Sequence, residues 1–455
     1  MTVILGAGLA GLSVSYHLGH ERCLLLERAS HAFGHVHTRT REGFTWDEGP
    51  HVSFTKNDYV RGVFAEAVGE ELLEYPVGIG NWFRGRWIDH PAQSNMYQVP
   101  EPLRTRCIES FLETRRRRAM RVPANYAEWL DAALGPVFAR TFPAAYTRKY
   151  WTVDPDRLGL DWIGKRFFFP TEEEVLAGAR APLDRQTHYI THVRYPRRGG
   201  YQAFASRLAE GARIQMETEV VGIDLREKRV CTSDGRILAY ERLVNTLPVP
   251  NFIDMCGNLP DAAREAARAL DCSSVWLVEA TAPHPTQRPE HWIYVYDEDL
   301  LSTRINCTER LSPCNALEGH TGVQVEVYFS RHRPLPCREG TLCDKVVDEL
   351  TVMGLLCPDL CPNGSRDIRA SVHRVPWANV IFTRETAAAL ETIWSALEPF
   401  GLRREPSDTH PLTDWSAAKP VPQDSVLVMA GRFGQWKYFW TDDCVLRGRA
   451  VGMRA

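Results

Sequence analysis

Three glycines near the start of the chain have the spacing that lets a backbone approach a dinucleotide. Gly6, Gly8 and Gly11 form a G-x-G-x-x-G pattern, and Glu27 follows further along. Gly6 permits a tight turn, Gly8 lets the backbone approach a pyrophosphate, and Gly11 lets a helix lie close to a sheet. The carboxylate of Glu27 would accept hydrogen bonds from ribose hydroxyls and repel a 2′-phosphate. These residue types predict a bound dinucleotide.

The segments around the glycines supply the elements that this turn requires. Residues 3–5 are an apolar run that predicts a buried strand, and the stretch after Gly11 through Leu12, Val14 and Leu18 has the spacing of an apolar helix. A second apolar run, residues 23–26, ends directly at Glu27. Strand, glycine turn, helix, strand and acid therefore follow in the order of a dinucleotide-binding βαβ unit. An ordinary glycine-rich turn is the alternative for the motif alone, and the matching strands, helix and acid disfavour it. The N-terminus of the helix would face the phosphates with unpaired N–H groups.

Length and composition limit the classes of protein that the chain can belong to. Its 455 residues are long enough for two or three structural units. The formal net charge of −3 excludes a globally basic nucleic-acid binder, and the arginine cluster at 115–118 and 121 fits a solvated helix face. No run approaches the ~18 apolar residues of a membrane span, and the opening run belongs to the cofactor fold and is not a signal peptide.

The twelve cysteines are scattered and form no C-x-x-C pair. Reduced thiols in a cytosolic enzyme are the simplest interpretation, so we expect a cytoplasmic protein without a metal site. Composition leaves the oligomeric state open.

Beyond the βαβ unit the chain changes character several times. Two aromatic runs at 81–97 flank Arg84-Gly85 and predict a hairpin, and helical patterns follow over 101–180. Residues 275–280, 292–296, 304–307 and 323–329 are rich in β-formers and predict a second sheet. An apolar strand at 425–430 leads into GRFGQWKYFWTDD and a last helix. No linker is long enough to separate independent domains, so the units are expected to be interleaved.

Five segments together resemble flavoproteins of the UDP-galactopyranose mutase type, within the superfamily of amine oxidases and protoporphyrinogen oxidases. They are the βαβ unit, WDEGPHVSF, RWIDHPAQSNMY, YTRKYWTVDPDRLGLDWIGKRF with STRINCTERLSP, and GRFGQWKYFWTDD. The similarity is greatest to the eukaryotic-type mutases and runs in patches from Val3 to Gly448. It implies an α/β fold in which a Rossmann-like FAD-binding domain is interleaved with a helical cap and a mixed β-sheet substrate domain. The expected FAD-binding domain comprises 1–80, 190–245 and 410–455, the hairpin and cap 81–189, and the substrate domain 246–409.

The resemblance implies FAD as the cofactor. His51 matches a histidine whose backbone lies near flavin N5, although Pro50 replaces a glycine beside it. Gly34 is followed by His35 where the superfamily usually has a second glycine. The expected cofactor-binding residues are Gly6, Gly8, Gly11, Glu27, Arg28, Gly34, Val221, Gly431, Arg432 and Asp442.

The resemblance also implies a nucleotide-sugar substrate. Gln93 and Asn95 match amides that hold a uracil, and amides can read a nucleobase edge with donors and acceptors. Arg166 and Arg304 match arginines that grip a diphosphate, because each guanidinium offers a fork of N–H donors. By our alignment Leu311 and Asn379 replace two tyrosines that contact the diphosphate in the family. The expected catalytic residues are His51, Arg166, Arg304 and Arg432, and the expected substrate-binding residues are Gln93, Asn95, Arg166, Arg304, Asn379 and Tyr438.

The implied activity is the ring contraction or isomerisation of a nucleoside-diphosphate sugar through an adduct at N5 of reduced flavin, with NAD(P)H as a possible external reductant. The alternative is an FAD-dependent oxidase or dehydrogenase of the amine oxidase or protoporphyrinogen oxidase type that acts on a small anionic substrate. An inactive, flavin-bound partner subunit is a third possibility. The identities of Leu311 and Asn379 leave the choice between mutase and net redox chemistry open.

Overall fold

The computed structural model describes residues 1–117, 122–164, 169–183, 190–362, 367–406 and 408–453. Its first unit is a five-stranded parallel sheet with the strand order β19-β13-β1-β2-β9. Central strands of a parallel sheet are covered on both faces, which explains the unbroken apolar runs of β1 and β2. The strands are β1 (Thr2–Leu5), β2 (Cys23–Leu26), β9 (Ile214–Gln215), β13 (Arg242–Asn245) and β19 (Leu427–Met429).

The two faces of this sheet carry different helices. Val3 and Leu5 face one hydrophobic core with α9, α10 and α13, whereas Ile4 faces the other with α1, α2, α8 and α15. Side chains of a strand alternate between faces, so the run Val3-Ile4-Leu5 supplies both cores. The helices are α1 (Leu9–Leu18), α2 (Asp58–Val68), α8 (Ser206–Ala209), α9 (Val249–Met255), α10 (Asp261–Ala269), α13 (Thr386–Leu397), α14 (Gly431–Gly434) and α15 (Thr441–Gly452).

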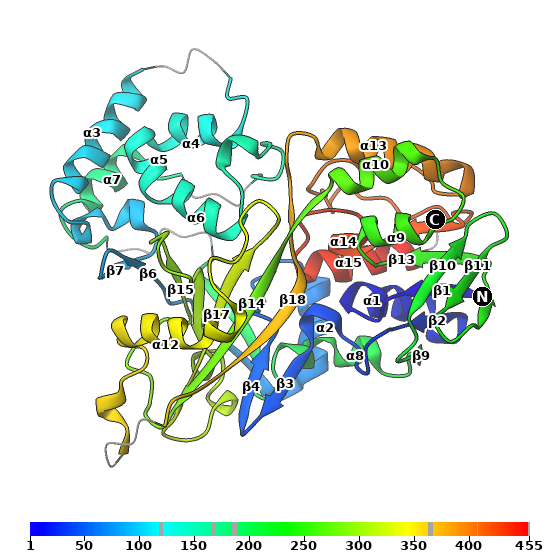
Figure 1. Ribbon diagram of the computed structural model, residues 1–455, viewed down its shortest axis with the longest axis horizontal. Helices are drawn as coiled ribbons and strands as arrows, with labels where there is room; N and C mark the ends of the chain where they lie inside the picture. Colours follow the sequence, from blue (N-terminus) through cyan, green and yellow to red (C-terminus); the bar gives the residue numbers. More distant parts are fainter. Residues whose placement is uncertain (118–121, 165–168, 184–189, 363–366, 407, 454–455) are drawn as a thin grey trace.

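The first and last segments of the chain lie against each other. A Cβ built on Gly448 of α15 would lie 2.1 Å from Oγ of Ser13 and 2.5 Å from the Ser13 carbonyl carbon, and one on Gly452 would meet His17. Glycine at both positions therefore lets α15 pack closely on α1. Both ends of the chain lie at the end of the molecule that carries β1 (Figure 1).

The second large unit is a seven-stranded sheet with the order β18-β14-β17-β16-β15-β6-β7. All neighbours are antiparallel except β15 and β6, which pair in parallel. The register places Arg304 of β16 directly opposite Glu326 of β17. The strands are β6 (Ile79–Phe83), β7 (Arg86–Asp89), β14 (Asp271–Ala282), β15 (Trp292–Val295), β16 (Arg304–Cys307), β17 (Thr321–Phe329) and β18 (Arg369–Ile381), and α11 (Thr308–Leu311) and α12 (Leu342–Val352) accompany them.

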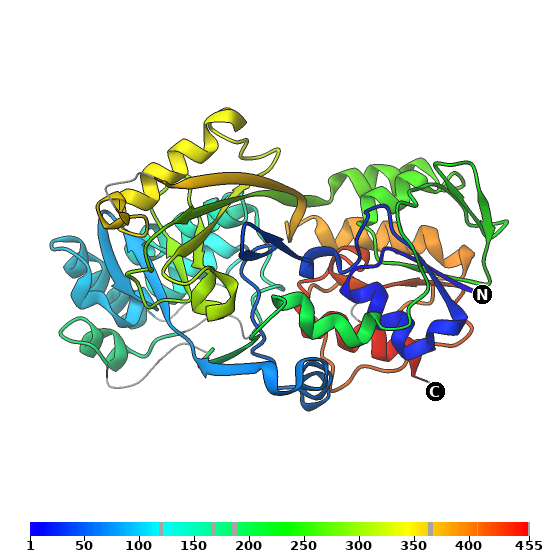
Figure 2. The same ribbon diagram turned by 90° about the horizontal axis from the view of Figure 1, so that it is seen from below.

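A group of helices stands at one end of this sheet, at the upper left of Figure 1. The predicted hairpin is confirmed, because β6 and β7 pair across Arg84-Gly85. The fold class is confirmed as well: a Rossmann-like unit, a helical cap and a mixed sheet share one chain, and the long strand β18 runs between the units (Figure 2). The cap helices are α3 (Leu103–Arg116), α4 (Tyr126–Leu134), α5 (Pro136–Thr141), α6 (Pro143–Tyr150) and α7 (Glu172–Gly178).

Spatial packing cuts across the ranges expected from the sequence. Helices α9, α10 and α13 fall within 246–409 but pack on the core of the five-stranded sheet. Strands β6 and β7 fall within or beside 81–189 but extend the seven-stranded sheet. The described residues also form smaller ladders: β3 (Thr38–Arg41) with β4 (Phe44–Asp47), β5 (Leu72–Pro76) with β8 (His192–Pro196), and β10 (Val220–Asp224) with β11 (Arg229–Thr232) and β12 (Ile237–Ala239).

Three expectations from composition can be compared with the described residues. All twelve cysteines are free thiols, as predicted. Within the described ranges, no helix combines the length and apolar character needed to cross a bilayer. The same part of the chain contains no group of three or more His, Cys, Asp or Glu side chains arranged to hold a metal ion.

Candidate active site

The glycine turn has the geometry that a dinucleotide requires. Gly6 has a positive φ of 92°, a conformation that side-chain-bearing residues rarely adopt. A Cβ on Gly11 would lie 2.1 Å from the carbonyl oxygen of Gly6, so only glycine lets α1 sit this close to β1. Gly8 caps α1 without any side chain over the helix N-terminus. The exposed N–H groups and the positive end of the helix dipole thus face the place expected for a pyrophosphate.

Glu27 stands at the end of β2 beside this turn. Its carboxylate accepts hydrogen bonds from the backbone N–H of Ala7 and of Ala29, both at 2.9 Å. A carboxylate has about four acceptor positions, so it keeps capacity for ribose hydroxyls. Arg28 follows on the surface, and Val221 in β10 is exposed. The turn, the uncapped helix and the fixed carboxylate together fit the adenosine diphosphate half of a dinucleotide.

The loop after Glu27 folds back over the glycine turn. The N–H of Phe33 donates to the carbonyl oxygen of Ala7 at 2.8 Å. Gly34 has a positive φ of 54°, and a Cβ on it would lie 2.9 Å from Cα of Gly8. Glycine is therefore required at position 34 for the loop to approach the turn, and the next residue, His35, reaches the wall of the main cavity.

That cavity has a volume of about 410 Å³ and lies where the cap and the seven-stranded sheet meet residues 431–443, which we call the closing segment. Cap helices α4, α5 and α6 line one side, strands of the large sheet line another, and residues of the closing segment line a third. The predicted residues that the structure brings together in its lining are His51, Gln93, Arg304, Asn379, Arg432, Tyr438 and Asp442.

Arg304 and Glu326 form a buried ion pair in the cavity wall. Nε and Nη2 of Arg304 donate to the two carboxylate oxygens of Glu326 at 2.5 and 2.7 Å. Burial opposes the charged guanidinium, yet Glu326 raises the pKa of Arg304 above its usual range. Glu326 was not predicted from the sequence. Its pairing leaves Nη1 of Arg304 as the edge that can donate to a ligand.

Tyrosines dominate the rest of the cavity. Tyr146 and Tyr150 come from α6, Tyr294 from β15 and Tyr328 from β17. The rings of Tyr146 and Tyr150 stack with their centroids 5.6 Å apart, and the ring of Tyr294 meets that of Tyr146 edge-on at 5.1 Å. Burial raises the pKa of all four phenols, so each stays protonated and can donate a hydrogen bond.

Two of the polar atoms in this wall have no partner among the described residues. Oη of Tyr146 and Nδ2 of Asn379 are buried without a hydrogen bond. Oδ1 of Asn379 faces Tyr150 Oη at 3.3 Å and Arg432 Nη1 at 3.4 Å. Because an unpaired buried polar group costs about 1–3 kcal/mol, such atoms fit a cavity that receives a polar ligand.

His51 and Arg432 form the side of the cavity nearest the glycine turn. Nδ1 of His51 lies 3.0 Å from the carbonyl oxygen of Gly49. Burial, together with the charges of Arg432 and Arg304, lowers the pKa of His51 to about 4, so the imidazole is neutral near pH 7. Nε of Arg432 donates to the carbonyl oxygen of Phe439 at 2.7 Å.

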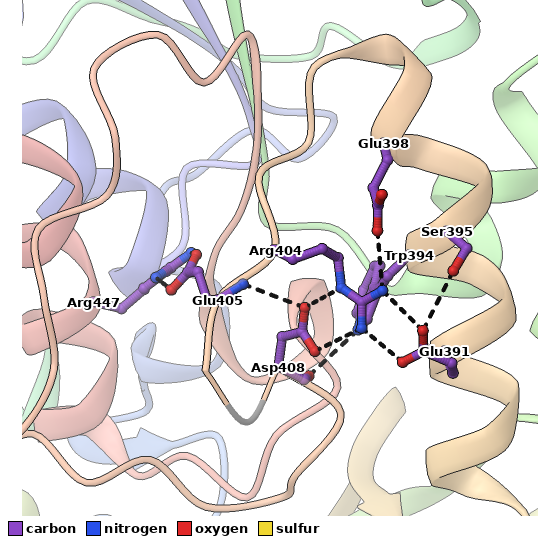
Figure 3. A network of polar contacts seen from close by, with 8 residues as sticks. All are labelled: Glu391, Trp394, Ser395, Glu398, Arg404, Glu405, Asp408 and Arg447. Atoms are coloured by element: carbon purple, nitrogen blue, oxygen red, sulfur yellow. Dashed lines mark hydrogen bonds and ion pairs between the residues drawn. The ribbon is translucent and has the colours of Figure 1, made fainter.

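The closing segment is held against the glycine turn by close contacts. Gly431 has a φ of 82°, and a Cβ on it would lie 2.7 Å from Cβ of Ala10 in α1. Arg447 donates two hydrogen bonds to the carbonyl oxygen of Met429 and pairs with Glu405. Figure 3 shows that Glu405 directly follows Arg404. The guanidinium of Arg404 donates hydrogen bonds to Glu391 in α13 and to Glu398 just after it. The network fixes the strand end that precedes Gly431 and Arg432.

The structure places some predicted residues elsewhere. Asn95 is absent from the cavity lining, and its side-chain amide donates to the carbonyl oxygen of Pro91 at 3.0 Å because it closes its own turn. Leu311 is 2 % exposed, belongs to the core cluster that also contains residues of α2 and α15, and is absent from the cavity lining, so position 311 removes no donor from the cavity. Arg166 lies outside the described residues.

A signal for the missed tyrosines was present in the sequence. The cavity is lined by aromatic residues at every second position of one segment: Trp292 and Tyr294 in β15, and Tyr296 directly after it. Side chains two apart in a strand share a face, so this period could have marked a common wall. No local pattern indicated that Glu326 would pair with Arg304.

Comparison with known proteins agrees with this arrangement. A profile of the family described as flavin containing amine oxidoreductase matches residues 9–387, well over half of the chain. The chain belongs to the flavin-containing amine oxidoreductases. A flavin cofactor and an enzymatic role as a flavoenzyme follow from membership of this family.

Solved structures show the same fold for this family member. A crystal structure of reduced UDP-galactopyranose mutase superposes with a TM-score of 0.84 at 22 % identity, covering 98 % of this chain and 92 % of the other. A structure from Exiguobacterium sp. 255-15, provisionally named protoporphyrinogen oxidase, gives 0.71 at 17 % identity, with 99 % and 97 % covered. At these identities the likeness shows the fold, and it confirms the resemblance to mutase-like flavoproteins.

Proposed function

We propose that the protein is an FAD-dependent enzyme that isomerises a nucleoside-diphosphate sugar in the manner of a mutase. The observation that carries the proposal is that one cavity contains both groups of residues that the resemblance assigned separately. Its flavin side has His51 and Arg432, and its substrate side has Arg304, Gln93 and Tyr438. The fold shared with UDP-galactopyranose mutase over nearly the whole chain supports the same proposal.

The residues divide the work between the two ends of a nucleotide sugar. Nη1 of Arg304 and the hydroxyls of Tyr146 and Tyr294 would donate to the diphosphate oxygens and stabilise charge as the nucleotide leaves the sugar. The aromatic floor of Trp151 and Tyr150 would exclude water from the sugar. The bound flavin, when reduced, supplies a nucleophilic nitrogen for the anomeric carbon and returns unchanged.

A net oxidoreductase of the amine oxidase or protoporphyrinogen oxidase type is the second candidate. The observation that favours it is the ion pair between Arg304 and Glu326, which neutralises much of the guanidinium charge that a diphosphate would use. The carboxylates of Glu48 and Asp442 also line the cavity. Such an enzyme would remove a hydride from its substrate and pass electrons from the flavin to an acceptor.

One experiment distinguishes the two candidates. The FAD-loaded protein is reduced anaerobically, UDP-galactopyranose is added, and the nucleotide sugars are separated after incubation. A new isomer formed while the flavin stays reduced supports the mutase proposal. No isomer from this substrate or from other nucleoside-diphosphate sugars, together with a substrate that bleaches the oxidised flavin, would support the oxidoreductase instead.

The proposed contact of Arg304 with a diphosphate is tested by measuring the affinity for UDP, which is monitored through the change that UDP causes in the flavin spectrum. Arg304→Ala should weaken UDP binding by about tenfold or more, since a hydrogen bond to a charged group contributes ~1.5–3 kcal/mol. Arg403→Ala is the matched control, because Arg403 is exposed and pairs with Asp424 outside the cavity. Equal affinities for the two variants would contradict the role given to Arg304.

A further inference from the structure

An imidazole occupies the junction between the glycine turn and the main cavity. His35 directly follows Gly34, whose backbone packs on Gly8, and it also lines the cavity. Its ring lies 5.5 Å from that of Phe433, the residue after Arg432. Gly8 marks where a pyrophosphate approaches the backbone, so His35 stands where a bound dinucleotide must pass from its phosphates to its flavin.

A carboxylate fixes the orientation of this imidazole. Nδ1 of His35 lies 3.1 Å from Oε2 of Glu48, and Nε2 of His373 lies 3.4 Å from Oε1 of the same carboxylate. Although burial opposes it, hydrogen bonds from His35 and His373 hold the pKa of Glu48 below its usual range, so the carboxylate stays charged. A carboxylate only accepts, so Nδ1 of His35 must carry a proton and donate it.

The fixed proton on Nδ1 determines what Nε2 can do. In the neutral ring Nε2 is an acceptor, which would repel a phosphate oxygen, whereas in the imidazolium it is a donor. Glu48 holds Nδ1 of His35, and Nε2 of His35 has no hydrogen-bond partner among the described residues.

We propose that His35, oriented by Glu48, donates a hydrogen bond from its imidazolium Nε2 to a phosphate oxygen of the bound flavin dinucleotide. The inference rests on the proposal that the flavin is FAD, and it is independent of the nucleotide-sugar activity. Other groups that titrate or carry charge around the imidazole are His37, His51, His373 and Arg432.

The experiment measures the affinity of the full-length apoprotein for FAD between pH 5.5 and pH 8.5, by the quenching of FAD fluorescence. Histidine is the side chain that ordinarily changes charge in this range. Wild type should bind FAD about tenfold or more tightly at the acidic end, and His35→Gln should lose this dependence. Glu48→Gln should weaken FAD binding at the acidic end of the range, because the imidazole loses the carboxylate that orients its ring.

His320→Gln is the matched control, since His320 lies outside the cavity lining, with Nδ1 near the carbonyl oxygen of Glu318 and its ring edge-on to Phe44. It should keep the wild-type profile. His35→Asn provides a second neutral variant, and circular dichroism checks that each variant is folded. Riboflavin, which lacks phosphates, should bind with the same affinity at both ends of the pH range in every variant.

Three results would overturn the proposal. The first is an unchanged pH profile in both His35→Gln and His35→Asn. The second is a riboflavin affinity with the same pH dependence as that for FAD, which would place the imidazole on the flavin ring. The third is a pH dependence seen for UDP binding to the holoenzyme but not for FAD, which would assign Nε2 to the phosphate of the substrate. A failure of sugar isomerisation leaves these FAD measurements unaffected, so the two proposals are tested separately.

Discussion

Replacing Arg447 by methionine tests whether the C-terminal network holds the site together. Arg447 is 3 % exposed in α15, and its guanidinium is shared between two partners. Nη1 and Nη2 donate to the carboxylate of Glu405 at 2.7 Å each, while Nε and Nη2 donate to the carbonyl oxygen of Met429 at 3.1 and 2.7 Å. Methionine keeps most of the apolar volume and removes every one of these bonds.

The expected decrease in the free energy of unfolding comes from two groups that Arg447→Met leaves without their partner, the carboxylate of Glu405 and the carbonyl oxygen of Met429. Breaking a buried ion pair by removing one partner costs ~3–5 kcal/mol, but Glu405 keeps a 30 % exposed side chain, which places its share near ~2 kcal/mol. The carbonyl of Met429 loses its charged donor at a cost of ~1–3 kcal/mol. We therefore expect Arg447→Met to lower the free energy of unfolding by about 3 kcal/mol.

The assay is urea unfolding of the holoprotein, combined with the flavin dissociation constant. Flavin binding should weaken as well, because Met429 lies two residues before Gly431 and the bonds from Arg447 to Met429 hold the start of the closing segment in place. Arg404→Met is the matched control from the same network in Figure 3. Arg404 is itself 30 % exposed, and its partners Glu391, Glu398 and Asp408 all keep access to solvent, so its loss should cost about 1 kcal/mol.

A double-mutant cycle with Glu405→Gln isolates the ion pair. Glu405→Gln together with Arg447→Met should cost less than the sum of the two single changes, because no uncompensated carboxylate remains. Two results would refute the idea that this network supports the closing segment. One is additive effects of the two changes, and the other is a decrease in the free energy of unfolding below about 1 kcal/mol for Arg447→Met alone.

Three further predictions follow from packing and burial. Gly448→Val should destabilise the fold by ~1–3 kcal/mol in thermal unfolding, since its side chain would push α15 off the backbone of Ser13. Burial raises the pKa of Asp47 from 3.8 to about 6, so the folded state binds the proton more tightly and the free energy of unfolding should fall by about 3 kcal/mol in total as pH rises from well below 3.8 to well above 6; in Asp47→Asn this fall should be absent from urea titrations. Leu311→Tyr should cost ~1–3 kcal/mol by overpacking and leave UDP affinity unchanged, because Leu311 lies in the core.

Each of these has a contrary outcome. A wild-type melting temperature for Gly448→Val would mean that α1 and α15 are not in close contact. An identical pH slope in wild type and Asp47→Asn would show that the buried carboxylate does not titrate in this range. Tighter UDP binding in Leu311→Tyr would return position 311 to the substrate site.

Local residue patterns were sufficient to predict the cofactor unit. The glycine spacing, the apolar strand on either side and Glu27 lie within thirty residues, and each acts through the backbone near it. The closing GRFG segment was associated with the flavin by its motif, and the contact of Gly431 with Ala10 places it beside α1. The hairpin over Arg84-Gly85 also followed from a local turn signal.

The substrate side depended on contacts between distant segments. Arg304 was expected to bind a diphosphate together with Arg166, and the register of β16 against β17 also pairs it with Glu326, which was not predicted. Asn95 turned onto the carbonyl of Pro91, and Leu311 went into the core. A residue that matches a family motif in sequence can therefore have a different neighbour in the fold, because that neighbour comes from a distant segment of the chain.

By itself the sequence determined where the chain makes the strands and the glycine turn of its first unit, and where the carboxylate of Glu27 follows them. Those features depend on the period of apolar residues and on backbone conformations open only to glycine, both of which are local. Only the tertiary structure decided which side chains share the cavity, because strand register and the packing of α6, β17 and the closing segment bring together residues hundreds of positions apart. The pairings of Arg304 with Glu326 and of His35 with Glu48 therefore became visible only in three dimensions.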